Sequence, residues 1–219
     1  MKDGFIKIAC ATPELKVADC DYNADKITEL IKDAFQKGVK VICFPELSIT
    51  GYTCGDLFLQ SALLNSAEEN LLRIVNETAE MEIISIVGIP FAYVNKLYNC
   101  AVVIYKGEIL GIVPKRNIPN YSEFYEARHF TKGFESDFDA VIGGKSVSFG
   151  TNQIFECNDI SGFTFGVEIC EDLWVGNTPS IKLAESGATI IFNLSASDEI
   201  IGKSEYRRTI VKAKSGSLI

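Results

Sequence analysis

Three side chains that could act together as a catalytic set each follow an apolar run of the sequence. The runs are residues 39–45, 109–114 and 163–169, and the side chains that follow them are Glu46, Lys115 and Cys170. Short apolar runs bounded by turn residues are typical of buried strands, so each side chain is expected at a strand end. A cysteine in such a place is more often a small core residue than a nucleophile.

A nucleophilic thiol needs a base and a nearby cation, because a free thiol with a pKa of about 8.5 is mostly protonated at neutral pH. Glu46 would supply the base and Lys115 the positive charge. The chain has one histidine, His129, so a cysteine-histidine dyad has a single candidate. The sequence therefore favours a glutamate, a lysine and a cysteine that meet at the ends of three strands.

The sequence around each of these three residues forms a distinctive motif. It reads Cys-Phe-Pro-Glu-Leu-Ser-Ile-Thr-Gly-Tyr at 43–52, Pro-Lys-Arg-Asn-Ile-Pro-Asn-Tyr at 114–121 and Glu-Ile-Cys-Glu-Asp-Leu-Trp at 168–174. These motifs resemble the nitrilase, or carbon-nitrogen hydrolase, superfamily, whose catalytic set is glutamate, lysine and cysteine in that order. Residues 122–130 and 193–197 are similar to the glutaminase domain of glutamine-dependent NAD synthetases, and the resemblance spans nearly the whole chain.

The resemblance implies hydrolysis of a carboxamide, the side chain of glutamine above all, through a cysteine thioester. Cys170 would attack the amide carbon, Glu46 would carry protons as base and acid, and Lys115 would supply fixed positive charge. Glu126 occupies a place where the superfamily often has a second glutamate that orients the lysine or the substrate. As an isolated residue in an acidic segment, Glu126 would instead face solvent.

Four further residues are expected to bind the substrate, namely Tyr52, Tyr121, Ser197 and Lys203. The last three match positions that bind glutamine in the synthetase glutaminases, and Tyr52 lies where the family keeps a tyrosine near the catalytic glutamate. Their alternative roles are loop tyrosines, a helix-capping serine and an exposed lysine. Many relatives have arginine in place of Lys203, and a lysine lacks the fork with which arginine grips a carboxylate in two places.

The resemblance also implies partners. The released ammonia would pass to a synthetase module that uses ATP and Mg²⁺ to activate nicotinic acid adenine dinucleotide, so no cofactor or metal is expected in the present domain. The Ser-Gly-Gly-x-Asp-Ser ATP-binding loop of such a module does not occur in the 219 residues. One alternative is a free-standing nitrilase-family amidase that acts on another amide, nitrile or carbamoyl compound. Another is a non-catalytic module of the same fold.

Composition limits the other function classes. With 219 residues and 47% hydrophobic content, the chain suits one sizeable core, and we predict a single domain over residues 1–219. The formal net charge of −8 argues against a surface for nucleic acid or anionic membrane. Seven cysteines without a Cys-x-x-Cys pair, together with one histidine, argue against zinc ribbons and redox pairs and predict a reduced, cytoplasmic protein. No apolar run approaches the length of a membrane span.

Helices with one apolar face are expected to pack against the strands that position the catalytic residues. Hydrophobic periodicity predicts a helix over residues 21–37 that ends at Gly38. A helix over 57–64 is expected next, followed by a separate helix that begins at Ser66, because Ser66 and Glu69 form a capping box pattern.

The pattern of expected strands indicates the type of sheet. A strand over 83–89 is expected to end at Pro90, and residues 98–105 and 108–113 are expected to form a hairpin around Lys106-Gly107. Helices that alternate with strands and hairpins favour a mixed-sheet α/β structure. The resemblance implies more, a four-layer αββα sandwich with its carboxy-terminal part missing and subunits that associate through their helical faces into a homo-oligomer.

Overall fold

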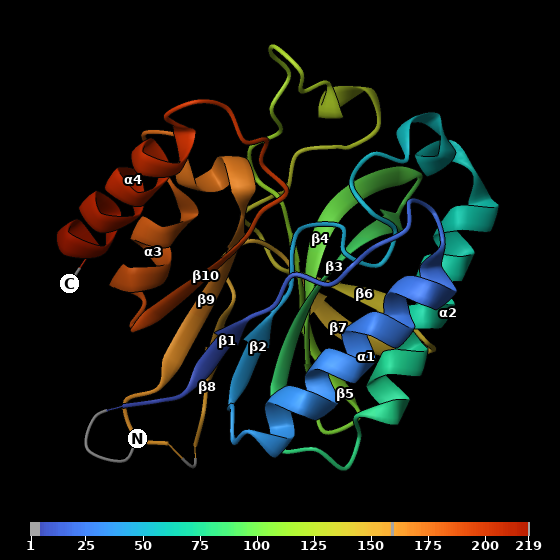
Figure 1. The fold of residues 1–219 in the computed structure, drawn as a ribbon, viewed down its shortest axis with the longest axis horizontal. Coiled ribbons are helices and arrows are strands. Elements are labelled where there is room, and N and C mark those ends of the chain that lie inside the picture. The colour runs from blue at the N-terminus through green and yellow to red at the C-terminus, as the bar shows by residue number, and fades with distance from the viewer. Residues whose placement is uncertain (1–4, 159, 219) are drawn as a thin grey trace.

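The fold consists of two β-sheets that face each other, with helices on both outer sides (Figure 1). The structure is a computed structural model and describes residues 5–158 and 160–218. The larger sheet has seven strands in the order β1-β2-β3-β4-β5-β7-β6, and the smaller has three in the order β10-β9-β8. The strands are β1 (Ile8–Cys10), β2 (Val41–Cys43), β3 (Ile84–Tyr93), β4 (Lys96–Tyr105), β5 (Glu108–Pro114), β6 (Phe138–Ile142), β7 (Lys145–Phe149), β8 (Ile154–Glu156), β9 (Thr164–Ile169) and β10 (Ile190–Leu194).

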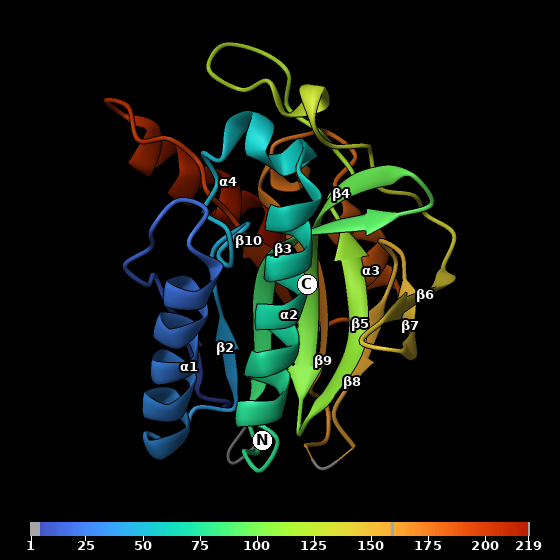
Figure 2. The ribbon, with the colours of Figure 1, turned by 90° about the vertical axis from the view of Figure 1, so that its right-hand side faces the viewer.

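The helices form the two outer layers. They are α1 (Cys20–Gln36), α2 (Ser61–Glu77), α3 (Pro179–Glu185) and α4 (Lys203–Leu218), and three short 3₁₀ helices are η1 (Gly55–Leu59), η2 (Glu126–Arg128) and η3 (Cys170–Leu173). Turned by 90°, the molecule shows α1 and α2 in front of the larger sheet and α3 and α4 behind the smaller one (Figure 2). The predicted four-layer αββα sandwich is therefore confirmed.

Two hydrophobic clusters hold these layers together. Along β4, Val102 and Ile104 belong to the cluster under α1 and α2, whereas Ala101 and Val103 belong to the cluster between the sheets. The smaller sheet fills that second cluster with Phe165 and other aromatic and branched side chains of β9 and β10. Because both faces of β4 are buried, its sequence from Cys100 to Ile104 is continuously apolar instead of alternating.

Helix α1 forms where the periodicity predicts it. The Asp19 side chain accepts a hydrogen bond of 3.1 Å from the amide of Tyr22, which satisfies one free N–H of the first turn. Ile27 and Ile31 are buried one turn apart against the larger sheet. Gly38 follows the helix with φ of +72°, a left-handed conformation that glycine adopts without steric cost.

Helix α2 differs from the prediction. It is one helix from Ser61, preceded by the 3₁₀ helix η1, and Ser66 lies inside it instead of capping it. The backbone carbonyl of Ser66 accepts a hydrogen bond from the Asn70 side chain. The capping box was wrong because Leu63 and Ala67 already belong to the buried stripe, so the helical face extends upstream of Ser66.

The larger sheet contains two consecutive hairpins. The predicted one around Lys106-Gly107 is confirmed, with φ of +47° and +78° at the two turn residues. Strand β3 continues past Pro90, contrary to the prediction, and turns into β4 after Tyr93. Pro90 is tolerated because β2 pairs with β3 only as far as Ile86, so the missing N–H lies where β3 has a neighbour on one side.

The strand directions place the residues predicted to be catalytic at one edge of the two sheets. Strands β1, β2 and β3 are parallel, and β5 runs the same way because it is antiparallel to β4, which is antiparallel to β3. In the smaller sheet, β9 and β10 are parallel. The segments that follow β2, β5, β9 and β10 meet at the upper edge of the two sheets in Figure 1. In the part of the chain that the structure describes, no helix is long and apolar enough to cross a membrane.

Candidate active site

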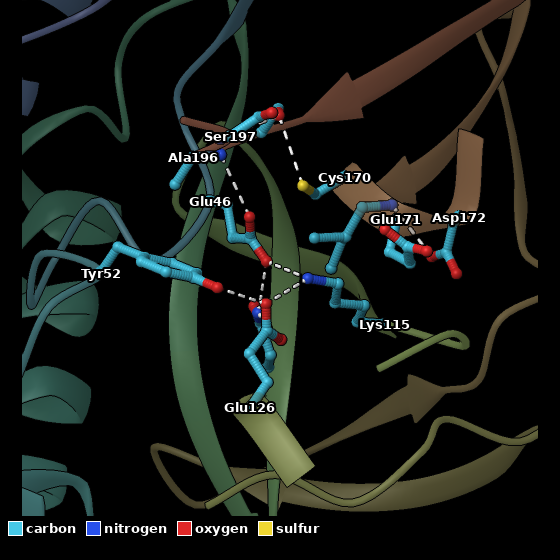
Figure 3. A network of polar contacts seen from close by, with 12 residues as sticks. Glu46, Tyr52, Lys115, Glu126, Cys170, Glu171, Asp172, Ala196 and Ser197 are labelled. Carbon is cyan, nitrogen blue, oxygen red and sulfur yellow. Dashed lines mark hydrogen bonds and ion pairs between the residues drawn. The ribbon is translucent and has the colours of Figure 1, made fainter. Parts of the chain in front are cut away.

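Glu46, Lys115 and Glu126 form a buried cluster of charges at that edge (Figure 3). The Nζ atom of Lys115 lies 2.6 Å from Oε1 of Glu46 and 2.7 Å from Oε1 of Glu126. Lys115 has an exposed fraction of 0% and Glu46 of 2%. Glu126 is buried too, so the surface position considered for it is wrong. An ammonium has three N–H groups, and the two glutamates take two of them, which leaves one for a substrate atom.

Asn99 and Tyr52 hold the two carboxylates in place. The Nδ2 atom of Asn99 donates to Oε1 of Glu46 at 2.6 Å and to Oε2 of Glu126 at 3.5 Å. The hydroxyl of Tyr52 donates to Oε1 of Glu126 at 2.6 Å. Sequence reasoning missed Asn99, although a buried asparagine inside the apolar run of β4 was a signal that could have indicated it.

Cys170 lies at the end of β9, as its sequence position predicts. It begins η3 with φ of +45°, a left-handed backbone that is strained for a residue with a side chain. Its exposed fraction is 4%. The hydroxyl of Ser195 lies 3.5 Å from the Cys170 sulfur, and the next residue, Ala196, donates its backbone N–H to Oε2 of Glu46 at 3.1 Å. The segment after β10 thus connects the thiol to the base, and the three predicted catalytic residues occupy one site.

The electrostatics of the cluster fix its resting protonation. Burial, followed by the charge of Glu46, raises the pKa of the Cys170 thiol to about 12, so the sulfur is protonated at neutral pH. Burial alone would lower the pKa of Lys115, but the charges of Glu46 and Glu126 outweigh it and raise that pKa. Burial and the nearby Glu46 raise the pKa of Glu126. The site therefore holds a neutral thiol beside a charged lysine and needs a base to activate the sulfur.

Asp172 joins the cysteine turn to the segment that follows Lys115. Its Oδ2 atom accepts the amide N–H of Ile169 at 3.1 Å and that of Arg116 at 3.3 Å. Its Oδ1 atom accepts the amide N–H and the side-chain Nδ2 of Asn117, both at 2.8 Å. Asp172 is buried, so these four donors replace the water it would otherwise bind. The carboxylate therefore fixes the spacing between two segments that carry catalytic groups.

Replacing Asp172 with asparagine is expected to lower the free energy of unfolding by about 2 kcal/mol, because an amide offers one oxygen where the carboxylate offers two. The donors that now meet Oδ2 would face an NH₂ group. Urea denaturation of the variant measures the loss, and the same change at the exposed Asp139 is the control. Equal stability of the two variants would contradict the role assigned to Asp172.

A pocket of about 500 Å³ opens beside the thiol. Cys170 lies in its wall together with three of the predicted substrate-binding residues, Tyr121, Ser197 and Lys203. The hydroxyl of Tyr121 donates to the Glu171 carboxylate at 2.8 Å. The Lys203 ammonium pairs with Asp198 and lies 5.6 Å from the ring centres of both Phe124 and Trp174. The pocket thus has an acidic group, a basic group and aromatic walls within reach of the sulfur.

Tyr52 lies apart from this pocket. It lines a second, smaller pocket of about 210 Å³ with Glu126 and His129, and its hydroxyl points at Glu126 (Figure 3). Its predicted role in substrate binding stays a prediction, and its contact is that of a residue that orients Glu126. The Nε2 atom of His129 lies 3.0 Å from the exposed Asp56. His129 and Cys170 line different pockets, and the structure shows no contact between them over the described residues.

Over residues 5–158 and 160–218, no group of three or more histidine, cysteine, aspartate or glutamate side chains could hold a metal ion. The charge that faces the thiol comes from Lys115. The arrangement as a whole can deliver a thiol to an electrophilic carbon, take up its proton and stabilise a negative charge.

Comparisons with known proteins find similar sequences. A family model described as carbon-nitrogen hydrolase matches residues 7–211. The glutamine-dependent NAD(+) synthetase of Mycobacterium tuberculosis is 39% identical over 212 residues, which cover 97% of this chain and 31% of that protein. The synthetase of Aquifex aeolicus is 33% identical, with 96% of this chain and 33% of that protein covered. The chain thus spans about a third of the length of these relatives.

Solved structures show the same fold. The glutamine-dependent NAD(+) synthetase from Cytophaga hutchinsonii matches 95% of this chain and 33% of its own with a TM-score of 0.84 and 28% identity. An amidase from Nesterenkonia sp. matches 95% of this chain and 71% of its own with a TM-score of 0.72. Its identity to this chain is 17%, so that likeness concerns the fold alone.

Proposed function

Because the chain belongs to the carbon-nitrogen hydrolase family, with a match over residues 7–211, we propose that it hydrolyses the side-chain amide of glutamine through a thioester on Cys170. The observation that carries this proposal is the buried contact of Lys115 with Glu46 beside the thiol. A pair of charges with no exposed surface is costly to bury, and its place next to a nucleophile gives it a chemical use.

The first half of the reaction forms the thioester. Glu46 takes the proton of the Cys170 thiol while the sulfur bonds to the amide carbon, and the carbonyl electron pair moves onto oxygen. Lys115 stabilises that oxygen with its remaining N–H and its charge. Glu46 then gives the proton to the nitrogen, the carbon–nitrogen bond breaks and ammonia leaves.

The second half releases the acid. Glu46 takes a proton from water, the hydroxide oxygen bonds to the thioester carbon, and the carbon–sulfur bond breaks as the electron pair returns from oxygen to the carbonyl. Glu46 then returns its proton to the Cys170 sulfur, so that the free thiol is restored and the product glutamate leaves. Both halves use the same base from the same position. Asn99 and the amide of Ala196 each donate a hydrogen bond to one carboxylate oxygen of Glu46, so the carboxylate keeps its orientation through the cycle.

The pocket beside Cys170 suits the rest of a glutamine molecule. The Glu171 carboxylate would face the α-ammonium group, and Tyr121 orients that carboxylate. Lys203 would face the α-carboxylate, since an ammonium has enough donors to hold Asp198 and a ligand together. The ammonia would serve a synthetase module that makes NAD, as the names of the relatives suggest. The use of ATP and Mg²⁺ by that module stays a prediction. The predicted homo-oligomer, single domain and cytoplasmic location stay predictions.

Ammonia release from a panel of amides tests this function. L-Glutamine is expected to exceed propionamide and L-asparagine by at least about 100-fold in kcat/KM, because two charge-assisted contacts and the correct chain length add several kcal/mol of binding in the transition state. In Lys203→Ala, the glutamine KM should rise about tenfold while the rate with propionamide stays the same. A small amide preferred over glutamine would indicate an amidase of other specificity, and release from no amide would indicate a non-catalytic module.

A further inference from the structure

The segment that follows β10 contacts both of the groups that react. The hydroxyl of Ser195 lies 3.5 Å from the Cys170 sulfur, and the amide of Ala196 lies 3.1 Å from Oε2 of Glu46. Strand β10 pairs with β9 in register as far as Leu194 opposite Ile169, so Ser195 directly follows the last pair and stands beside the cysteine. The position of Ser195 relative to the sulfur is therefore set by the sheet and not by a free loop.

The hydrogen bonds around Ser195 decide where its hydroxyl proton points. The amide N–H of Ser197 donates to the Ser195 oxygen at 3.3 Å. A hydroxyl has one proton and two lone pairs, so an oxygen that already accepts a hydrogen bond remains free to donate. With Ser197 as donor on one side, the sulfur is the acceptor on the other. The hydroxyl is thus oriented as a donor to the atom that gains negative charge.

We propose that Ser195 is a further catalytic residue, whose hydroxyl donates a hydrogen bond to the Cys170 sulfur and stabilises the negative charge on it in the transition states. The proposal rests on the proposed thiol chemistry. The O–H bond of Ser195 stays intact, and the thiol proton still goes to Glu46. The sulfur gains charge as its proton leaves, and gains charge again when the thioester breaks, so the same contact helps both halves of the reaction.

Two other features distinguish Ser195 from an ordinary polar neighbour. The sulfur lies in a buried site, where an electrostatic contact is stronger than in water. Burial and the charges of Glu46 and Glu126 disfavour the thiolate, whereas Lys115 and the Ser195 hydroxyl favour it. Lys115 is shared between two carboxylates, so the hydroxyl is the contact directed at sulfur alone.

The test measures the reactivity of the thiol itself. Purified wild-type protein and the variants Ser195→Ala and Ser195→Thr are treated with iodoacetamide between pH 6 and 10, and the adduct on the Cys170 peptide is followed by mass spectrometry. Ser195→Ala should be alkylated roughly tenfold more slowly at neutral pH, the size expected for one hydrogen bond to a charged acceptor, with its profile displaced to higher pH. Ser195→Thr keeps a hydroxyl and should restore the wild-type profile.

The control is Ser161→Ala, an exposed serine in the turn before β9, at the opposite end of the strand from Cys170. It should match the wild type. Equal profiles for wild type and Ser195→Ala would overturn the proposal, and so would faster alkylation of Ser195→Ala, because that would show a packing role. Circular dichroism of each variant establishes that the fold is retained.

A second readout separates this proposal from the proposed function. With glutamine, Ser195→Ala should lower kcat about tenfold and leave KM unchanged, because the contact is made to the reacting atom and not to the bound substrate. If no amide is hydrolysed but the alkylation profiles differ as expected, glutaminase activity is refuted and the contact stands. If glutamine is hydrolysed and Ser195→Ala has wild-type kcat and alkylation, the glutaminase stands and the role of Ser195 is refuted.

Discussion

Replacing Cys170 with alanine is expected to abolish ammonia release from glutamine, with a fall in kcat of at least about 10⁴-fold. The reaction runs through a covalent bond to sulfur, and a methyl group cannot form it. The remaining charges would still surround the carbonyl, but a water molecule in place of the thiol has no strand end to position it. A coupled assay for ammonia, with a mass spectrum to confirm the single change, measures the loss.

A second cysteine provides the control. Cys157 lies in the turn between β8 and β9, at the other end of the smaller sheet, and Cys157→Ala should keep the wild-type rate. Active Cys170→Ala protein would refute the thioester mechanism. The retained fold of the variant is checked by its unfolding midpoint, which should change little because alanine removes a single heavy atom, the sulfur.

The chemistry could be predicted where residue type and local pattern coincide. Glu46, Lys115 and Cys170 each follow an apolar run, which predicted a strand end for each of them, and their residue types suit one catalytic set. The hydrogen bonds that orient the catalytic side chains could not be predicted in the same way. Asn99 sits inside a buried strand, and Ala196 acts through a backbone amide, which has no signature in the residue type.

For the fold, too, local sequence patterns predicted some features and failed at others. Periodicity identified α1 because one stripe of its residues is buried and its ends carry a side-chain cap and a glycine. It failed at the start of α2, where Ser66 and Glu69 match a cap pattern although the buried stripe already began at Leu63. Local patterns are degenerate there, and packing against the larger sheet decides between them. Only the resemblance to a known superfamily implied that the two sheets face each other.

The second large effect is expected at Lys115. Lys115→Met keeps an unbranched side chain one atom shorter but removes the charge, so the buried carboxylates of Glu46 and Glu126 lose their common partner. We expect a loss of about 3–5 kcal/mol in the free energy of unfolding at neutral pH, because uncompensated buried charge is strongly destabilising. Ammonia release should also fall by at least about 10²-fold, because the oxyanion loses its stabilising charge. Lys132→Met, at an exposed lysine, is the control for both measurements.

The loss of stability in Lys115→Met should depend on pH, with a sign that follows from Glu126. Burial and then the charge of Glu46 raise the folded-state pKa of Glu126 above its ordinary value of 4.5. The folded state therefore binds the Glu126 proton more tightly than the unfolded state, so the contribution is fully present below about pH 4.5 and is lost as pH rises through the folded pKa. Lys115 opposes this shift, and its removal must raise the pKa of Glu126 further. The gap between wild type and Lys115→Met in urea denaturation should thus be widest at neutral pH and shrink towards pH 4. A gap that stays constant between pH 4 and pH 8 would show that the lysine acts by packing alone and not by its charge.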